Sequence, residues 1–264
     1  MRSYIIPLIV SFAALASCSR QAPEPKYDIN CPVRSVMVHA SKGELDHLVT
    51  FDRDGHATAA EYYNEDGTFR YRNEYSYDAA GRVEEILLVN AAGESEERWE
   101  FKYDGEFVAD CTISGMNNEH VHRWLHTNDG TNIVRTVYCQ EDVPTYIITR
   151  EYEGEICHET TCDAETGETV GTALSSQFTK DKVLYIKSET TDLSVEYDEK
   201  GLPVKARNTS LDSECQILWE PSLMDEPERF FSYEFDARGN WTVRKEYSHP
   251  DSVEVAVISR EIKY

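Results

Sequence analysis

The histidines of this 264-residue chain are the side chains best suited to hold a metal ion. His120 and His122 are separated by one residue, and His126 follows four positions later. Residues two apart on a β-strand share a face, so both imidazoles could reach one Zn²⁺, with Glu119 or His126 completing the shell. The competing interpretation, which we favour, is a polar strand or loop beside Trp124. The sequence therefore predicts no metal site and no cofactor.

Two further stretches match ligand motifs only in part. His158-Glu159-Thr160-Thr161-Cys162 approaches the His-Glu-x-x-His zinc-protease motif, but Cys162 replaces the second histidine and two threonines disfavour the required helix. Asp52-Arg53-Asp54-Gly55 with Glu61 fits part of a calcium-binding loop. Position 1 of that loop would be Thr50, which has no carboxylate. Neither stretch is predicted to bind a metal, and the second is interpreted as a hairpin turn.

No other motif in the sequence indicates catalysis. There is no Gly-x-Ser-x-Gly elbow, no phosphate-binding glycine loop and no dinucleotide fingerprint. The formal charge of −23 repels phosphate backbones and argues against nucleic-acid binding. The 16 Tyr, 9 Phe and 4 Trp supply apolar area for a folded core. An enzyme is therefore not predicted, and the alternative is a hydrolase with a site near His120, His122, His126 and His158.

One turn pattern recurs along the chain: an aromatic residue, Asp or Asn, two variable residues and Gly. Asp or Asn bonds its side chain to the backbone just ahead, and the glycine accepts a left-handed conformation, as in a hairpin connection. From Asp52 the turns follow at alternating intervals of 12 and 14 residues, which leaves room for strands of about 9 to 10 residues. The pattern occurs at Phe51–Gly55, Tyr63–Gly67, Tyr77–Gly81, Tyr197–Gly201 and Phe235–Gly239, and without the aromatic at Val89–Gly93.

Between these turns the residues alternate with period two. Aromatic and apolar residues occupy one set of alternate positions and charged residues the other, which predicts antiparallel strands with one buried and one solvated face. We expect Phe69, Tyr71, Tyr75, Tyr77, Trp99, Phe101, Tyr103, Trp241, Val243 and Tyr247 to point inward, and Arg70, Arg72, Glu74, Ser76, Arg98, Glu100, Lys102, Thr242, Arg244 and Glu246 to face water.

The Tyr-Asp-x-x-Gly units, with continuations such as Gly239-Asn240-Trp241-Thr242-Val243, resemble the YD repeats of RHS-type proteins. More closely, they resemble small bacterial lipoproteins built from degenerate copies of such repeats. The resemblance covers roughly residues 45 to 105 and 180 to 247, while residues 108 to 176 depart from it. No toxin domain or long shell of repeats accompanies the units, so the encapsulating role of large RHS proteins is not implied.

The N-terminus has the features of an export signal. Met1-Arg2 precedes an apolar run from Tyr4 to Leu15, which is shorter than the roughly 20 residues needed to span a bilayer. The ending Leu15-Ala16-Ser17-Cys18 resembles the lipobox of bacterial lipoproteins, which implies cleavage before Cys18 and lipid on that residue. Ser19 stands where an inner-membrane retention signal would have Asp, so the resemblance favours the outer membrane. The expected partners are the membrane, through Cys18, and an envelope protein or glycan.

Six cysteines remain beyond Cys18. An even number in an exported chain predicts disulfides, although free, buried thiols remain an open alternative. Four residues separate Cys157 from Cys162, a spacing that could close a local loop. Because four of the six lie between residues 108 and 176, we expect disulfides to support that stretch. The candidates are Cys31, Cys111, Cys139, Cys157, Cys162 and Cys215.

These observations predict an all-β fold with three segments. Residues 1–17 form a signal peptide, 18–30 the lipid-bearing cysteine and a flexible tether, and 31–264 a β-hairpin repeat domain with an irregular middle at about 108–176. Its antiparallel meander of about 12 to 16 strands should be curled or barrel-like, because large sheets twist. A membrane-spanning barrel is not predicted, since charged residues occupy the face that lipid would require to be apolar. The predicted function is a membrane-anchored, non-enzymatic binding or structural module.

Overall fold

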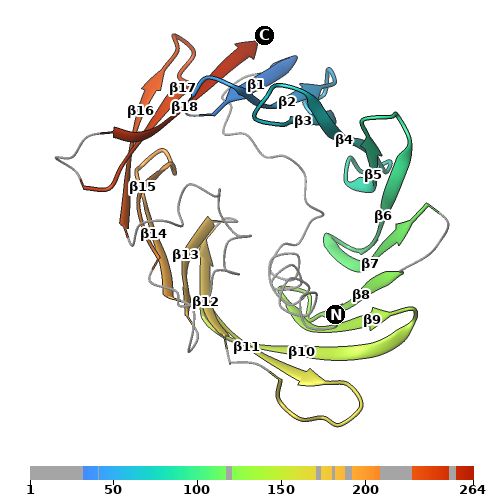
Figure 1. Cartoon of the computed structure of the whole chain (residues 1–264). Helices are drawn as coiled ribbons and strands as arrows, with labels where there is room; N and C mark the ends of the chain where they lie inside the picture. Colours follow the sequence, from blue (N-terminus) through green and yellow to red (C-terminus); the bar gives the residue numbers. More distant parts are fainter. Residues whose placement is uncertain are drawn as a thin grey trace. The chain divides into compact units, whose positions relative to one another are not determined.

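The structure, a computed structural model, describes residues 32–40, 42–116, 121–170, 174–179, 182–187, 192–208, 228–249 and 254–264. Every regular element in these ranges is a β-strand, and the strands are numbered β1 to β18 (Figure 1). The predicted all-β antiparallel meander is confirmed, and its 18 described strands exceed the expected count. The described residues contain no helix of the length and apolar character that crossing a membrane requires.

The described residues fall into two compact units, each built around an antiparallel ladder. The first unit takes the described residues of Lys102–Thr112 and His120–Phe230, and the second those of Ala22–Phe101, Ile113–Glu119 and Phe231–Tyr264. In the second unit β1 pairs with both β2 and β18, so the last strand lies beside the first.

The first ladder runs through β8 (His122–Asn128), β9 (Ile133–Gln140), β10 (Val143–Glu153), β11 (Ile156–Asp163), β12 (Leu174–Thr179), β13 (Lys182–Lys187), β14 (Asp192–Tyr197) and β15 (Pro203–Asn208). The second runs through β17 (Trp241–Tyr247), β18 (Glu254–Lys263), β1 (Ser35–His39), β2 (Leu45–Phe51), β3 (Ala57–Tyr63), β4 (Phe69–Tyr77) and β5 (Val83–Asn90). β6 (Ser95–Asp104), β7 (Phe107–Gly115) and β16 (Glu228–Phe235) contribute residues to both units.

The recurring turn has the predicted geometry. Oδ1 of Asp52 accepts the backbone N–H groups of Asp54 and His56, both at 2.9 Å. Gly55 has a φ of +91°, in the left-handed region that glycine adopts without a steric penalty. The same pair of side-chain hydrogen bonds recurs at Asp78, Asn90, Asp198 and Asp236. The hairpin interpretation of the stretch from Asp52 to Gly55 is therefore confirmed.

Shifts in strand register accompany these turns. The register of the paired strands shifts by one residue just before the first Asp of the turn. The shift lies between Ser76 and Tyr77 in the β4–β5 pair and between Glu196 and Tyr197 in the β14–β15 pair. A type I turn followed by a left-handed glycine produces such a bulge. The turn thereby fixes the register of both strands, and register decides which side chains share a face.

The stretch from 108 to 176, predicted to be irregular, instead contains most of β7 and all of β8 to β11. Its hairpins use turns that the Asp-x-x-Gly pattern does not describe. Glu141 and Asp142 join β9 to β10 with φ values of +51° and +63°, and Gly154 has a φ of +66° between β10 and β11. Two consecutive positive φ values are typical of a type I′ turn, which favours Asn-Gly.

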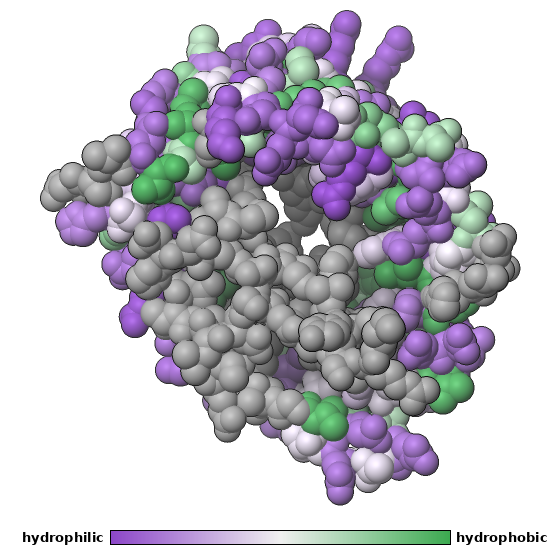
Figure 2. All heavy atoms as spheres, viewed as in Figure 1, coloured by the Kyte–Doolittle hydropathy of each residue, from purple (hydrophilic) through white to green (hydrophobic). Residues whose placement is uncertain are grey.

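Alternation of buried and exposed residues holds along β6. Phe101 is buried whereas Glu100 and Lys102 are exposed, as predicted. Val36 on β1 and Val49 on β2 are fully buried within apolar clusters. Hydrophilic side chains cover most of the visible surface of the described residues (Figure 2), in keeping with the acidic composition.

Strand β17 departs from the predicted alternation. Arg244 and Glu246, expected in water, are only 8% and 0% exposed. Nη2 of Arg244 donates to Oε1 of Glu246 at 2.8 Å, and the guanidinium carbon lies 5.7 Å from the Phe231 ring centroid. Trp241 is also buried, with the Arg260 guanidinium carbon 3.3 Å from its ring centroid. Two opposite charges two positions apart can enter the interior together because each neutralises the other.

The turn between β9 and β10 offers a test of stability. Replacing Glu141 by Asn and Asp142 by Gly should raise the free energy of unfolding by roughly 1 to 2 kcal/mol, because these residues tolerate positive φ far better than Glu and Asp. The change removes a 3.7 Å contact between Arg123 and Asp142, whose side chain is 78% exposed, so little is lost. Urea denaturation measures the effect. Glu199→Asn is the control and should leave the free energy of unfolding unchanged. An unchanged or lower stability of the double variant would show that the positive φ values of Glu141 and Asp142 cost no free energy.

Candidate functional site

Buried polar side chains on one face of β8 to β11 form the candidate site. His126 on β8 pairs with Thr136 on β9, and Thr136 pairs with Ile148 on β10. Arg150 lies two positions beyond Ile148, on the same face, and pairs with Glu159 on β11. All four strands belong to the first unit. We call His126, Thr136, Arg150 and Glu159 the polar network.

Arg150 is the centre of the polar network. Its side chain is fully buried, and its Nη1 donates to Oγ1 of Thr136 at 2.9 Å. Its Nε lies 2.9 Å from Oε2 of Glu159, whose side chain is only 6% exposed. Both ions have given up their hydration, so each is stable there only while the other is present.

His126 extends the network toward β8. Its Nδ1 lies 2.9 Å from Oγ1 of Thr136. We infer that the threonine hydroxyl, whose oxygen accepts an N–H of Arg150, donates its own proton to Nδ1 and that the ring proton resides on Nε2. Burial, and after it the charge of Arg150, lower the pKa of His126 from 6.5 to about 4. The imidazole is therefore neutral at neutral pH.

An aromatic row continues the same face. His122 and Trp124 precede His126 at two-residue intervals on β8, and Tyr138 pairs with Trp124. The Tyr138 ring is nearly parallel to the rings of His122 and Tyr146, with centroids 6.0 Å away in both cases. The Tyr138 hydroxyl lies 2.6 Å from Nδ1 of His122. Burial raises the pKa of Tyr138 to about 12, so this hydroxyl stays protonated.

The candidate zinc ligands do not converge in the part of the chain that the structure describes. Glu119 and His120 lie outside the described residues. His122 and His126 each bond to a neighbour on β9, and four residues of extended strand separate them by roughly 13 Å. Across the described ranges, no group of three or more His, Cys, Asp or Glu side chains could hold a metal ion.

The stretch from His158 to Cys162 lies within strand β11, not on a helix. His158 pairs with Glu151, so it points away from the face that carries Glu159 and His126. Its side chain is 45% exposed, with Nε2 4.0 Å from a carboxylate oxygen of Glu153. Since His126 and His158 lie on opposite faces of the sheet, the hydrolase site considered from the sequence is not assembled from these two residues.

Four of the candidate disulfide cysteines form no disulfide in the described part of the chain, namely Cys111, Cys139, Cys157 and Cys162. Cys157 and Cys162 share one extended strand, where five positions span roughly 16 Å. A disulfide needs Cα atoms within about 7 Å, so the predicted local loop does not form. Cys111 on β7 and Cys139 on β9 are likewise kept apart by β8. Cys18, Cys31 and Cys215 lie outside the described residues, so their lipidation or pairing stays a prediction.

Burial also settles the reactivity of Cys111. It raises the pKa of this thiol well above its usual range, and the neighbouring Asp110 carboxylate raises it further. A protonated thiol is a poor nucleophile, which matches the position of Cys111 among the buried residues.

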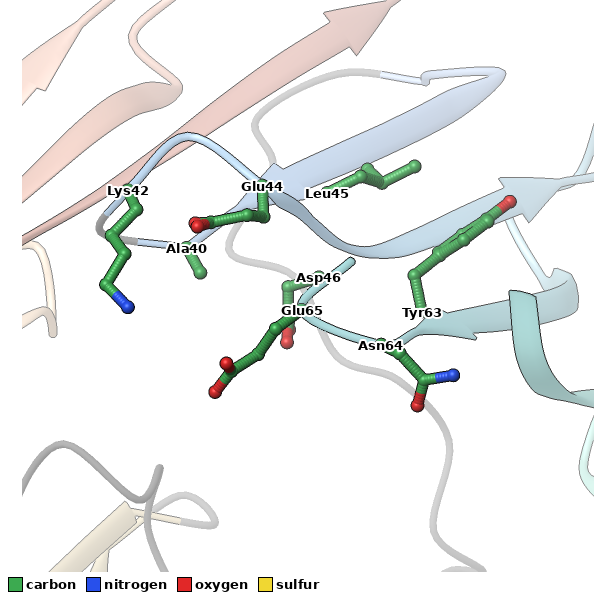
Figure 3. A pocket seen from close by; sticks show the side chains of 8 residues that line it. All are labelled: Ala40, Lys42, Glu44, Leu45, Asp46, Tyr63, Asn64 and Glu65. Atoms are coloured by element: carbon green, nitrogen blue, oxygen red, sulfur yellow. The ribbon is translucent and has the colours of Figure 1, made fainter. Parts of the chain in front are cut away.

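A hollow of about 220 Å³ lies in the second unit, between the loop that leads into β2 and the turn that follows β3 (Figure 3). Its lining includes Lys42, Asp46 and Glu65, all of them exposed to solvent. Exposed charges are screened by salt and hold a ligand weakly. We assign no binding role to this hollow.

The sequence patterns did not single out Arg150, and they brought up Glu159 only as part of the incomplete zinc-protease motif. A signal was nevertheless present, because Tyr146, Ile148, Arg150 and Tyr152 occupy alternate positions of one strand. Because side chains at alternate positions of a strand share a face, an arginine in register with three apolar or aromatic residues is predicted to lie on the buried face. What the period does not reveal is the residue across the strand that neutralises the charge.

Comparison with known proteins gives a distant structural likeness. No protein-family model matches the chain, and no curated protein matches it. A porin-like protein from Bacteroides uniformis aligns with a TM-score of 0.41 at 9% identity, over 88% of this chain and 98% of its own. A porin-like protein from Bacteroides vulgatus aligns with a TM-score of 0.32 at 8% identity, over 89% and 99%. Similarity at this level shows neither a shared family nor a shared function.

The polar network predicts acid sensitivity. Folding disfavours protonation of His126, so the unfolded state binds more protons between pH 6.5 and about 4. The free energy of unfolding should therefore keep its full value above pH 6.5. It should fall as the pH drops toward 4, by up to roughly 3 kcal/mol. Urea denaturation across this window measures the slope. His126→Gln should flatten the dependence of stability on pH, and the surface variant His158→Gln should leave it unchanged. A slope in His126→Gln equal to that of the parent chain would show that His126 is not the group responsible.

The buried ion pair predicts a non-additive pair of substitutions. Arg150→Met should cost about 3 to 5 kcal/mol of unfolding free energy, because it leaves Glu159 charged and buried. Adding Glu159→Leu should restore most of that loss, since no uncompensated charge remains. Lys205→Met is the matched control, because Lys205 and Glu228 pair at 3.1 Å with exposures of 30% and 42%, and its cost should stay below about 1 kcal/mol. A double variant as unstable as Arg150→Met would contradict this account.

Proposed function

We propose that the chain is an exported lipoprotein, anchored to the bacterial outer membrane by lipid on Cys18. Its β-hairpin sheet serves as a non-enzymatic binding or structural module of the envelope, with an envelope protein or glycan as its partner. The observation that carries the location is the ending Leu15-Ala16-Ser17-Cys18 after a short apolar run. Two or more acyl chains on one cysteine hold a protein firmly at a membrane without spanning it.

The architecture of the described residues supports a role in binding or structure. Turns with the same two side-chain hydrogen bonds recur at five positions, from Asp52 to Asp236, and join long antiparallel strands. Such a repeated sheet presents broad faces, which suit contacts with proteins or sugars. The side chains with distinctive chemistry are engaged in structural contacts, as Arg150 is with Thr136 and Glu159.

The structure does not favour a hydrolase with a site near His120, His122, His126 and His158. His158 lies on the opposite face of the sheet from His126, and His126 is bonded to Thr136 within the polar network. A general base must reach the proton that it removes, and these two imidazoles cannot serve one substrate atom.

Replacing Cys18 tests the anchor. Cys18→Ala should release the protein from the membrane fraction, because the residue that carries the lipid is gone. Cys31→Ala is the matched control, since it removes another cysteine of the N-terminal region and should leave the protein in the membrane fraction. Mass spectrometry of the N-terminal peptide should show an acylated cysteine in the parent chain. Membrane retention of Cys18→Ala, or an unmodified peptide in the parent, would contradict the proposal.

A further inference from the structure

Three buried N–H donors on one face of the first unit have no acceptor. They are Nε1 of Trp124, Nη2 of Arg150 and, in the tautomer inferred above, Nε2 of His126; none of these atoms has a hydrogen-bond partner among the described residues. Trp124 and His126 are two positions apart on β8, and Arg150 shares Oγ1 of Thr136 with His126. An unpaired buried polar group costs about 1 to 3 kcal/mol, so three on one face call for a physical explanation.

The unpaired atoms of this face are all donors. Indole and guanidinium groups have no acceptor, and His126 uses its acceptor nitrogen on the Thr136 hydroxyl. A ligand rich in hydroxyl groups would bring donors as well as acceptors and would leave its own donors unpaired. A carboxylate or phosphate brings acceptors alone, and guanidinium groups bind both with strong, charge-assisted hydrogen bonds.

We propose that Trp124, His126 and Arg150 form a binding site for a small oxyanion, a carboxylate or a phosphate, on this face of β8 to β10. This site specifies a ligand class for the binding role proposed above, and in that sense rests on it. Its donors are withdrawn from bulk water, because Arg150 has no exposed side-chain surface and Trp124 is only 6% exposed. His122, His126 and Tyr146 are half-buried, so the margin of the face is open to solvent.

Charge balance gives the site a second property. Arg150 is already neutralised by Glu159 at 2.9 Å, so a bound anion adds an uncompensated negative charge. His126 is the neighbouring group that can take up a proton and restore neutrality. Anion binding and protonation of His126 therefore favour each other, and affinity should rise as the pH falls from neutral toward 6.

The indole N–H signal of Trp124 reports on binding directly. In ¹H–¹⁵N NMR spectra of the purified full chain, Trp124→Phe assigns that signal while keeping an aromatic ring in place. Sodium acetate and sodium phosphate are titrated separately against sodium chloride of equal ionic strength, near pH 6 and near pH 7.5. We expect a saturable shift of the Trp124 signal with at least one oxyanion, tighter at the lower pH, and none with chloride. The two titrations distinguish a carboxylate from a phosphate ligand.

Variants decide whether the polar network is responsible. His126→Leu should weaken binding about tenfold or more, because a charge-assisted hydrogen bond is lost. His158→Leu removes a histidine from the opposite face and should bind like the parent chain. The absence of a saturable shift in the parent chain overturns the proposal, since ordered water then satisfies the donors. Unchanged affinity in His126→Leu overturns it equally. Because the titration uses purified protein, failure of the envelope location does not affect the result.

Discussion

The fold depends on a side chain that completes a turn. The first residue of the repeated turn, as at Asp78, accepts two backbone N–H groups that the hairpin would otherwise leave unpaired, and Gly81 provides the left-handed residue that closes it. These contacts set the bulge that precedes the turn and with it the register of two strands. A slip of one residue would exchange the buried and solvated faces of a whole strand. Each turn therefore contributes more to the stability of the fold than its own hydrogen bonds do.

A fixed register allows charged residues to enter the interior. Arg150 meets Glu159 across two strands, whereas Arg244 meets Glu246 along one strand, and in both cases the carboxylate is almost wholly buried. Neither arginine could stay there alone, because an unpaired buried ion keeps its full desolvation cost. Each unit thus contains a charge pair that adds little net stability but strongly penalises any arrangement that separates its members.

The repeat turns could be predicted from residue types alone, because Asp, Asn and Gly act locally. The charge pairs could not, since alternation does not say which neighbour lies across a strand. Residue pairing about the Gly154 turn is symmetrical, however, so Glu153 faces Ile156, Tyr152 faces Cys157 and Arg150 faces Glu159. Recognising Gly154 as a hairpin turn would therefore have revealed the Arg150–Glu159 pair. The missing information was the conformation of one short turn.

The acidic composition of the chain explains why the polar network has no excess positive charge. The chain has 49 acidic but only 26 Lys and Arg residues, so a buried arginine always has carboxylates available to neutralise it. Arg150 is already paired with Glu159, and Thr136 occupies another of its donors. Any further acceptor must therefore be held by hydrogen bonds that remain and by a proton on His126, not by net positive charge. In an acidic protein the surface potential repels anions. Proton uptake by His126, more than that potential, therefore controls the affinity of the polar network for an anion.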